Sequence, residues 1–405
     1  MKKVVLVGAS MRATAFVKTL RNNFADSYKI VGILDCDPGK MKGFKETYAL
    51  EDVPAFTDFD EMCKAVAPDM VIVSTVDATH KEYIVKALDR KIACVSEKPL
   101  CVNAEQCREI LAAQERNPEV FAVTSHNARY LPMTLKMKEL IDQGVIGKVM
   151  RMEYAEMLDR YHGTSYFRRW NSRRKNSNGL QLHKSCHHFD KMNFLLNSHA
   201  VEVMADGCLT AYGNKVPHKY EGVNCHTCQY ARECPDYQDY NHKIFQSDMY
   251  TPDMCIYSPD IDIEDNYSAT IKFANGVMCS YSLCAHAQYE GEIIIVEGEK
   301  GRLESRHTYC REVVANDQNV HGDNVVYTST LRLFRFRQSG FEDIEFAEGS
   351  GGHGGADLNV FTDIFSEPPA PNVPTLMDGV QAVLTGCALV ESMKTGKKCM
   401  VQEQL

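Results

Sequence analysis

The run of residues 182–190, Leu-His-Lys-Ser-Cys-His-His-Phe-Asp, carries the side chains best suited to chemistry in this chain. His183 and His187 are four residues apart and Asp190 follows three residues later, so on a continuous helix all three share one face. A neutral imidazole near neutral pH is the natural base for a hydroxyl proton. A metal site is disfavoured, because the run lacks the His-Glu-x-x-His order and a third ligand nearby. We expect His188, which lies off this face, to be structural.

A second motif, Glu97, Lys98 and Pro99, follows residues 92–96, which we predict to form a buried strand. In open α/β sheets, ligands bind beyond the carboxyl ends of the strands. A lysine at such an edge, beside a bound ligand, is partly desolvated and suits proton transfer. The alternative is an ordinary surface lysine.

The chain begins with a strand–turn–helix signature. Residues 4–7 predict a buried strand, and Gly8, Ser10 and Ala13 follow as a variant of the G-x-G-x-x-G run at the start of a helix. Gly8 permits a tight turn, Ser10 is small enough for a pyrophosphate to approach, and Ala13 lets the helix pack on its strand. The helix N-terminus supplies amide donors for phosphate. This pattern predicts a dinucleotide site.

Asp35 ends a predicted strand over residues 30–34. A carboxylate there accepts from the adenosine ribose hydroxyls and repels a 2′-phosphate, which favours NAD over NADP. The alternative is that Asp35 only begins the turn at residues 37–39, and Arg12 could still tolerate a phosphate. Further cofactor contacts are expected at Met11, Arg12, Ser74, Thr75, His80, Glu97, Lys98 and Asn127.

Hydrophobic patterning divides the chain in two. Over residues 1–125, continuous apolar strands alternate with helices, which predicts a doubly wound parallel sheet in an α/β fold. Over residues 126–405 we expect a second α/β domain with a large open, mostly antiparallel sheet, because alternating strands follow one another across turn residues. The predicted strands there cover residues 268–273, 277–283, 292–297 and 398–401, with a helix over 376–394 and loops over 159–178 and 350–355.

Composition restricts the class of protein. The chain has 405 residues, 44% hydrophobic and 24% charged, which suits a two-domain globular protein. The net charge of −9 disfavours nucleic-acid binding. No apolar run approaches the ~20 residues that span a membrane, and the start of the chain has no signal-peptide core. We therefore expect a cytoplasmic protein whose cysteines are reduced.

These motifs together resemble the Gfo/Idh/MocA family of glucose–fructose oxidoreductase and inositol 2-dehydrogenase-like proteins, over nearly the whole length. The resemblance includes the Gly8 turn, the Glu-Lys-Pro motif, and residues 127–130, 144–148 and 352–357. His183 stands where the family commonly has Asp, whereas the general base, His187, is kept.

The resemblance implies an N-terminal Rossmann domain, NAD as cofactor, and a homo-oligomer packed through the open sheet. It implies an oxidoreductase that acts on a carbohydrate or polyol. His187 would take a proton from a ring hydroxyl while hydride leaves the same carbon for the nicotinamide. Lys98 would hydrogen-bond that oxygen, and His183 would orient the substrate or pass the proton onward.

Two other functions fit the same residues. One is a glycosidase that oxidises a sugar transiently, eliminates the aglycone, adds water and reduces the product again. The other is a non-catalytic sugar-sensing regulator, against which the intact Lys98 and His187 argue.

A basic segment with the single Trp, Trp170, suggests a way to hold the substrate. Its cations are Arg160, Arg168, Arg169, Arg173, Arg174 and Lys175. The segment is either a solvated or subunit-contact loop, or a lid whose arginines bind an anionic sugar while Trp170 stacks on a ring face. The expected substrate contacts are Arg129, Tyr130, Arg168, Trp170, Lys184 and His353.

Four cysteines form a further pattern. Cys225, Cys228 and Cys234 lie within ten residues of sequence, and Cys255 is within reach of a loop. Four thiolates could hold a structural zinc ion. The alternative is a set of reduced structural cysteines.

Overall fold

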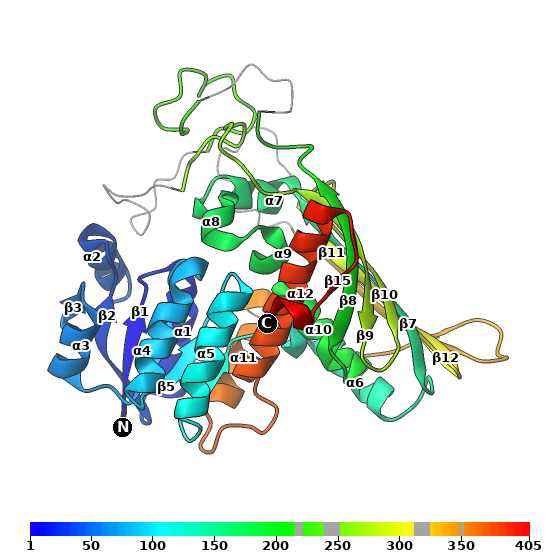
Figure 1. Cartoon of the computed structure of the whole chain (residues 1–405), viewed down its shortest axis with the longest axis horizontal. Helices are drawn as coiled ribbons and strands as arrows, with labels where there is room; N and C mark the ends of the chain where they lie inside the picture. The colour runs from blue at the N-terminus through cyan, green and yellow to red at the C-terminus, as the bar shows by residue number, and fades with distance from the viewer. Residues whose placement is uncertain (215–221, 239–251, 312–324, 348, 350–351) are drawn as a thin grey trace.

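The computed structural model describes residues 1–214, 222–238, 252–311, 325–347, 349 and 352–405. Within these residues the chain forms two sheets, with helices between and around them (Figure 1). The predicted α/β architecture, a parallel sheet followed by a large and mostly antiparallel one, is confirmed.

The first sheet is parallel and has the strand order β3-β2-β1-β4-β5-β6. Its strands are β1 (Lys2–Val7), β2 (Tyr28–Leu34), β3 (Ala55–Phe56), β4 (Met70–Val73), β5 (Ala93–Ser96) and β6 (Ala122–Thr124). The helical segments that alternate with them are α1 (Met11–Asn23), α2 (Pro38–Thr47), α3 (Phe59–Val66), η1 (Asp77–Thr79), α4 (His80–Asp89) and α5 (Ala104–Arg116). This order defines a Rossmann sheet, and the order reverses between β1 and β4, which places a ligand crevice at their carboxyl ends.

The second sheet has the order β14-β13-β12-β11-β7-β10-β9-β8-β15, in which only β7 and β10 pair in parallel. Its strands are β7 (Val149–Asp159), β8 (Ala200–Cys208), β9 (Asn266–Phe273), β10 (Met278–Ala287), β11 (Glu290–Gly298), β12 (Gly301–Arg311), β13 (Val325–Arg335), β14 (Glu342–Asp343) and β15 (Cys399–Met400). Every second residue of β9 is buried, as expected for a strand with one covered face.

Helices join the two sheets. α12 (Leu376–Thr395) lies between them, packed on β8 on one side and on α5 and β6 on the other (Figure 1). α11 (Ala356–Phe365) returns to the Rossmann half, where Phe361 stacks on Phe16 of α1 with ring centroids 4.2 Å apart. Further helical elements are η2 (Ala128–Tyr130), α6 (Pro132–Asp142), α9 (Leu180–His183), α10 (Cys186–Leu196), η5 (Gly352–Gly355) and η6 (Gln402–Gln404).

The predicted loop over residues 159–178 is wrong. This segment forms α7 (Arg160–Phe167), η3 (Trp170–Ser172) and α8 (Arg174–Ser177). Asp159 caps α7 by accepting from the His162 amide at 2.7 Å. Phe167 is fully buried, so the segment is held by apolar packing as well as by its charges.

Candidate active site

The turn after β1 packs closely against the backbone that follows β4. Gly8 has φ +103°, and a Cβ there would lie 2.7 Å from the backbone of Ser74, so only glycine fits. Ser74 Oγ donates to the Gly8 carbonyl oxygen at 3.0 Å. Ser10 caps α1 by accepting from the Ala13 amide at 3.2 Å, and Met11 begins the helix half-exposed. This geometry fits the pyrophosphate of a dinucleotide at the helix N-terminus.

Asp35 lies just past β2, as predicted, and is buried. Its carboxylate accepts from the Ala9 amide at 2.8 Å and from the Asp37 amide at 3.1 Å. Lys40 forms an ion pair with it at 3.2 Å. The carboxylate is therefore rigidly held at the position expected to bind ribose, with a lysine beside it that sequence reasoning did not select.

Several predicted cofactor residues meet around Asp357, at the start of α11. Arg12 forms ion pairs with Glu97 at 2.9 Å and with Asp357 at 3.1 Å. Asn127 donates to the same carboxylate at 2.7 Å, and His353 Nδ1 lies 2.7 Å from it. Burial opposes the charge on Arg12, but the two carboxylates raise its pKa above the ordinary value. Arg12 therefore joins the cofactor turn to α11, and Asp357 was missed although it lies in the quoted 352–357 motif.

His80, predicted to contact the cofactor, is buried, and both of its ring nitrogens lie near backbone carbonyl oxygens. Its Nδ1 lies 2.8 Å from the carbonyl oxygen of Pro99, and its Nε2 lies 3.1 Å from that of Thr75. It therefore connects the segment after β4 to the Glu-Lys-Pro motif and holds the backbone on either side of the crevice.

Lys98 and His183 meet at this crevice. Nζ of Lys98 donates to the backbone carbonyl oxygen of His183 at 3.0 Å. The imidazole of His183 is bonded in turn to Asp77, which lies in η1 beyond β4, with Nδ1 and Oδ2 2.5 Å apart. The structure thus brings the two predicted catalytic motifs together and adds a carboxylate that neither motif contains.

His187 is a neutral imidazole in a crowded polar environment. Burial is the main cause that lowers its pKa well below 6.5, and the charges of Lys98 and Lys184 lower it further. Its Nδ1 is buried without a hydrogen-bond partner among the described residues. The ring of His126, itself fully buried, lies edge-on with centroids 6.2 Å apart. An imidazole in this state can accept a proton.

The prediction that His183, His187 and Asp190 share one helix face is wrong. α9 ends at His183 and α10 begins only at Cys186, so the chain turns between the two histidines. Asp190 instead accepts from Arg129 Nε at 2.9 Å. His188 is buried, and its Nδ1 lies 2.8 Å from the hydroxyl of Tyr281, in keeping with the structural role that we expected.

Three predicted substrate residues, Arg129, Tyr130 and Arg168, contact other groups of the protein. Arg129 is buried and paired with Asp190 and, at 3.3 Å, with Asp378. Tyr130 packs in the core under the Rossmann sheet, its hydroxyl 3.5 Å from the carbonyl oxygen of Asn372. Arg168 is buried and donates to Cys225 Sγ at 3.3 Å and to the Asp236 carbonyl oxygen. Each of the three side chains therefore has partners within the protein, and its contact with a substrate stays a prediction.

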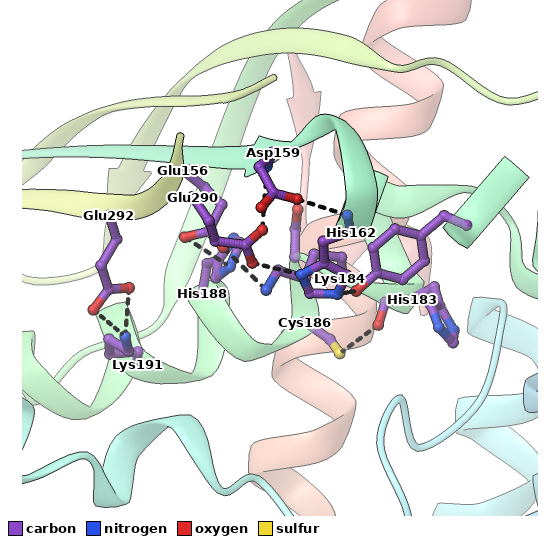
Figure 2. A network of polar contacts seen from close by, with 12 residues as sticks. Glu156, Asp159, His162, His183, Lys184, Cys186, His188, Lys191, Glu290 and Glu292 are labelled. Carbon is purple, nitrogen blue, oxygen red and sulfur yellow. Dashed lines mark hydrogen bonds and ion pairs between the residues drawn. The ribbon is translucent and has the colours of Figure 1, made fainter. Parts of the chain in front are cut away.

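Trp170 and Lys184 do lie at the site. The Trp170 ring meets the His183 imidazole edge to face, with centroids 5.3 Å apart, and Tyr166, which sequence reasoning missed, does the same at 5.5 Å. Lys184 forms an ion pair with Glu156 at 3.0 Å. Figure 2 shows Lys184 and His188 directed toward Glu156, whereas His183 points away from them.

Beside these residues, the sheet carries a network of buried acids and bases (Figure 2). His162 Nδ1 lies 2.5 Å from Glu290, and its Nε2 lies 2.9 Å from the Tyr166 hydroxyl. Lys191 pairs with Glu292 at 2.7 Å. Glu156 and Glu292 are each paired with a lysine, which offsets the cost of burying these charges.

Arg160, Arg173 and Arg174 of the basic segment face acidic partners, whereas Arg169 donates to the Ser165 carbonyl oxygen at 2.8 Å. Arg160 pairs with Asp236 at 2.8 Å, and Arg174 pairs with Glu264 at 2.7 Å. These pairs connect the segment to Asp236 and Glu264, and both the lid and the solvated or subunit-contact loop stay predictions.

The zinc prediction is not supported. Among the described residues, no group of three or more His, Cys, Asp or Glu side chains is placed so that it could hold a metal ion. Cys225 contacts Arg168 instead, and the Cys228 sulfur accepts from the Tyr230 amide at 3.4 Å. Across the part of the chain described here, no helix is long and apolar enough to cross a membrane.

Comparison with known proteins agrees with this fold. Two family models match: the NAD-binding Rossmann fold of the oxidoreductase family over residues 2–125 and its C-terminal alpha/beta domain over residues 138–401. The chain belongs to the Gfo/Idh/MocA oxidoreductase family.

Individual relatives give more detail. YteT of Bacillus subtilis is 35% identical, with 97% of this chain and 95% of YteT covered. Inositol 2-dehydrogenase of Salmonella typhimurium is 25% identical over 36% of this chain and 43% of its own length. The 2,7-anhydro-N-acetylneuraminate hydratase of Mediterraneibacter gnavus is 28% identical over 48% of each. The structure of a levoglucosan dehydrogenase in complex with NADH superposes with a TM-score of 0.71 at 15% identity and 99% coverage of both chains, which shows a shared fold.

Proposed function

We propose that this protein is an NAD-dependent oxidoreductase of a sugar or polyol, in which Lys98 and His187 act on the hydroxyl of the carbon that is oxidised. One observation carries the proposal: Lys98 and two neutral imidazoles lie together at the carboxyl edge of a Rossmann sheet, beside a turn that only glycine can form.

Different residues would bind the cofactor, transfer the proton and contact the sugar. Gly8, Ser10 and the N-terminus of α1 would hold the pyrophosphate, and Asp35 would accept from the ribose hydroxyls, which favours NAD over NADP. The bound nicotinamide supplies hydride transfer. His187 accepts the hydroxyl proton, and the ammonium of Lys98 stabilises the negative charge that develops on the oxygen. Trp170 covers an apolar face of the sugar ring.

The relatives support a ring-shaped, hydroxyl-rich substrate. One is named for inositol, and the hydratase is named for an anhydro sugar acid. The hydratase relative also supports a second candidate, in which transient oxidation permits elimination and the addition of water, with no net change of the cofactor. A homo-oligomer packed through the open sheet remains a prediction.

Product analysis separates the candidates. We would incubate the purified protein and NAD with a panel of inositols, aldoses and glycosides, and follow NADH absorbance together with the mass of the product. Net oxidation yields NADH in equal amount to a product that has lost two hydrogens. The second candidate yields cleaved or hydrated product without NADH. Sugar binding with neither product would show a sensor and would overturn the proposed activity.

A further inference from the structure

Asp77 and His183 come from separate parts of the sequence and meet at the carboxyl edge of the Rossmann sheet. Asp77 begins η1 just beyond β4, and His183 ends α9. The Asp77 Oδ2 to His183 Nδ1 distance is 2.5 Å, and the exposed fractions of the two side chains are 3% and 14%. Such a short contact between two largely buried groups excludes a loose surface pairing.

The carboxylate determines where the imidazole carries its proton. An ionised carboxylate accepts hydrogen bonds and cannot donate them, so neutral His183 must have its proton on Nδ1. Nε2 is then left as an acceptor. A carboxylate in this position also stabilises the imidazolium that forms when Nε2 takes up a proton.

Two aromatic rings hold the plane of this imidazole. Trp170 meets it at an interplanar angle of 88° and Tyr166 at 74°. These edge-to-face contacts, together with the bond at Nδ1, leave the ring little rotational freedom. Nε2 is therefore preorganised, as a group that transfers protons must be.

The surrounding charges distinguish the two histidines of the site. Burial lowers the pKa of His183, Asp77 opposes that shift, and Lys98 and Arg169 add to it. For His187, every principal influence lowers the pKa. Only His183 has a carboxylate to compensate the positive charge that it gains with a proton.

We propose that His183 is a second proton acceptor of this active site, beside His187, and that Asp77 is the residue that positions it. The inference rests on the proposed function. In the assigned step, an O–H bond of the bound sugar or polyol breaks as hydride leaves the same carbon for the nicotinamide of the proposed cofactor. The proton forms an N–H bond at Nε2, and the O–H electron pair forms the C=O bond. Release of the proton to water restores His183. Two proton acceptors fit a ring with hydroxyl groups on neighbouring carbons, because His183 and His187 can each face one of these hydroxyls.

The tautomer can be measured on the free protein by NMR of ¹⁵N-labelled histidine, with His183→Gln to assign the signal. We expect His183 to be neutral at pH 7 with its proton on Nδ1. Asp77→Asn should shift the proton toward Nε2, because an amide can donate to Nδ1. The matched control is Asp89→Asn, whose carboxylate pairs with Arg116 on the surface at 2.7 Å and which should leave the signal unchanged. A proton on Nε2 in the wild type, or no response to Asp77→Asn, would overturn the pairing.

Turnover then tests the role. Asp77→Asn should lower kcat by about 100-fold or more, the contribution of a positioned acid–base group, with little change in cofactor affinity. Asp77→Asn combined with His183→Gln should be no slower than His183→Gln alone, since Asp77 acts only through His183. If the kcat losses of the two single variants multiply in the double variant, the positioning role of Asp77 is overturned. If the wild type turns over no sugar or polyol, the proposed function fails, while the tautomer still decides the pairing.

Discussion

Nζ of Lys98 donates a hydrogen bond to the backbone carbonyl oxygen of His183, across 85 residues of sequence. Lys98 follows β5 of the Rossmann sheet, whereas His183 ends a short helix beside the second sheet. The contact joins the two halves of the chain at the point where the cofactor turn, Asp77 and the imidazoles converge. The site therefore depends on how the two halves are held together.

Replacing either member of the proposed acid–base pair should abolish most turnover. We expect Lys98→Ala and His187→Ala each to lower kcat by about 100-fold or more, through loss of oxyanion stabilisation or of the base. NAD binding, measured by titration, should survive, because the phosphates are held at the Gly8 turn. Lys86→Ala on the outer face of α4 is the control. Near-normal turnover in either variant would refute its assigned role.

The pH profile should reflect lowered imidazole pKa values. Oxidation requires neutral His187 and His183, and burial lowers the pKa of both below 6.5. A base with a lowered pKa stays neutral as the pH falls through 6.5, so kcat/KM for oxidation should remain flat there and decline only at lower pH. A midpoint at or above pH 6.5 would contradict this assignment.

The same histidines should make folding sensitive to acid. Below pH 6.5 the unfolded chain binds protons on His126 and His187 that the folded protein resists, since burial lowers the pKa of both. The free energy of unfolding should therefore be highest above pH 6.5 and fall as the pH drops below it. Denaturant titrations from about pH 7.5 to about pH 5.5, roughly one unit either side of the ordinary histidine pKa, provide the measurement. His126→Gln should flatten the slope.

Cofactor choice should depend on Asp35 and its lysine partner. We expect tighter binding of NAD than of NADP, because the Asp35 carboxylate repels a 2′-phosphate. Lys40→Gln removes the ion pair measured at 3.2 Å and should strengthen this preference. Fluorescence titration of both cofactors is the test, with the exposed Lys42→Gln as control. Equal affinities in the wild type would refute the preference.

Arg168 should matter for stability and not for substrate charge. Its buried bonds to Cys225 and to the Asp236 carbonyl oxygen are charge-assisted, and losing them in Arg168→Ala should cost about 1.5–3 kcal/mol of unfolding free energy. The ratio of KM values for charged and neutral sugars should stay constant. A selective rise in KM for an anionic sugar would restore Arg168 to the substrate site.

Much of the fold followed from local sequence. The apolar run at residues 4–7 is fully buried, as in the strands of a doubly covered parallel sheet, and the Gly8 turn needs a residue without a Cβ. The strict alternation of β9 identifies a strand with one covered face. These features depend on neighbouring residues, so the sequence alone reveals them.

Hydrogen-bond and ion-pair partners that are distant in the sequence cannot be predicted from such local patterns. The sequence near Arg129 and Arg168 does not show that Asp190 accepts from the first and the Asp236 carbonyl oxygen from the second. Sequence reasoning therefore predicts substrate contacts for both arginines. The helix break after His183 was also invisible, because the residues from His183 to Asp190 fit a helical period without interruption.

The sequence by itself determined the Rossmann sheet, the glycine turn, and a lysine and two histidines as candidate chemistry, because periodicity and turn geometry are local properties. Only the tertiary structure decided which charges neutralise one another, and it joined Asp77 to His183 from opposite parts of the chain. The physical reason is that a buried ionisable group takes its protonation state from whatever partners packing brings within bonding distance. Those partners are fixed by the docking of the two halves.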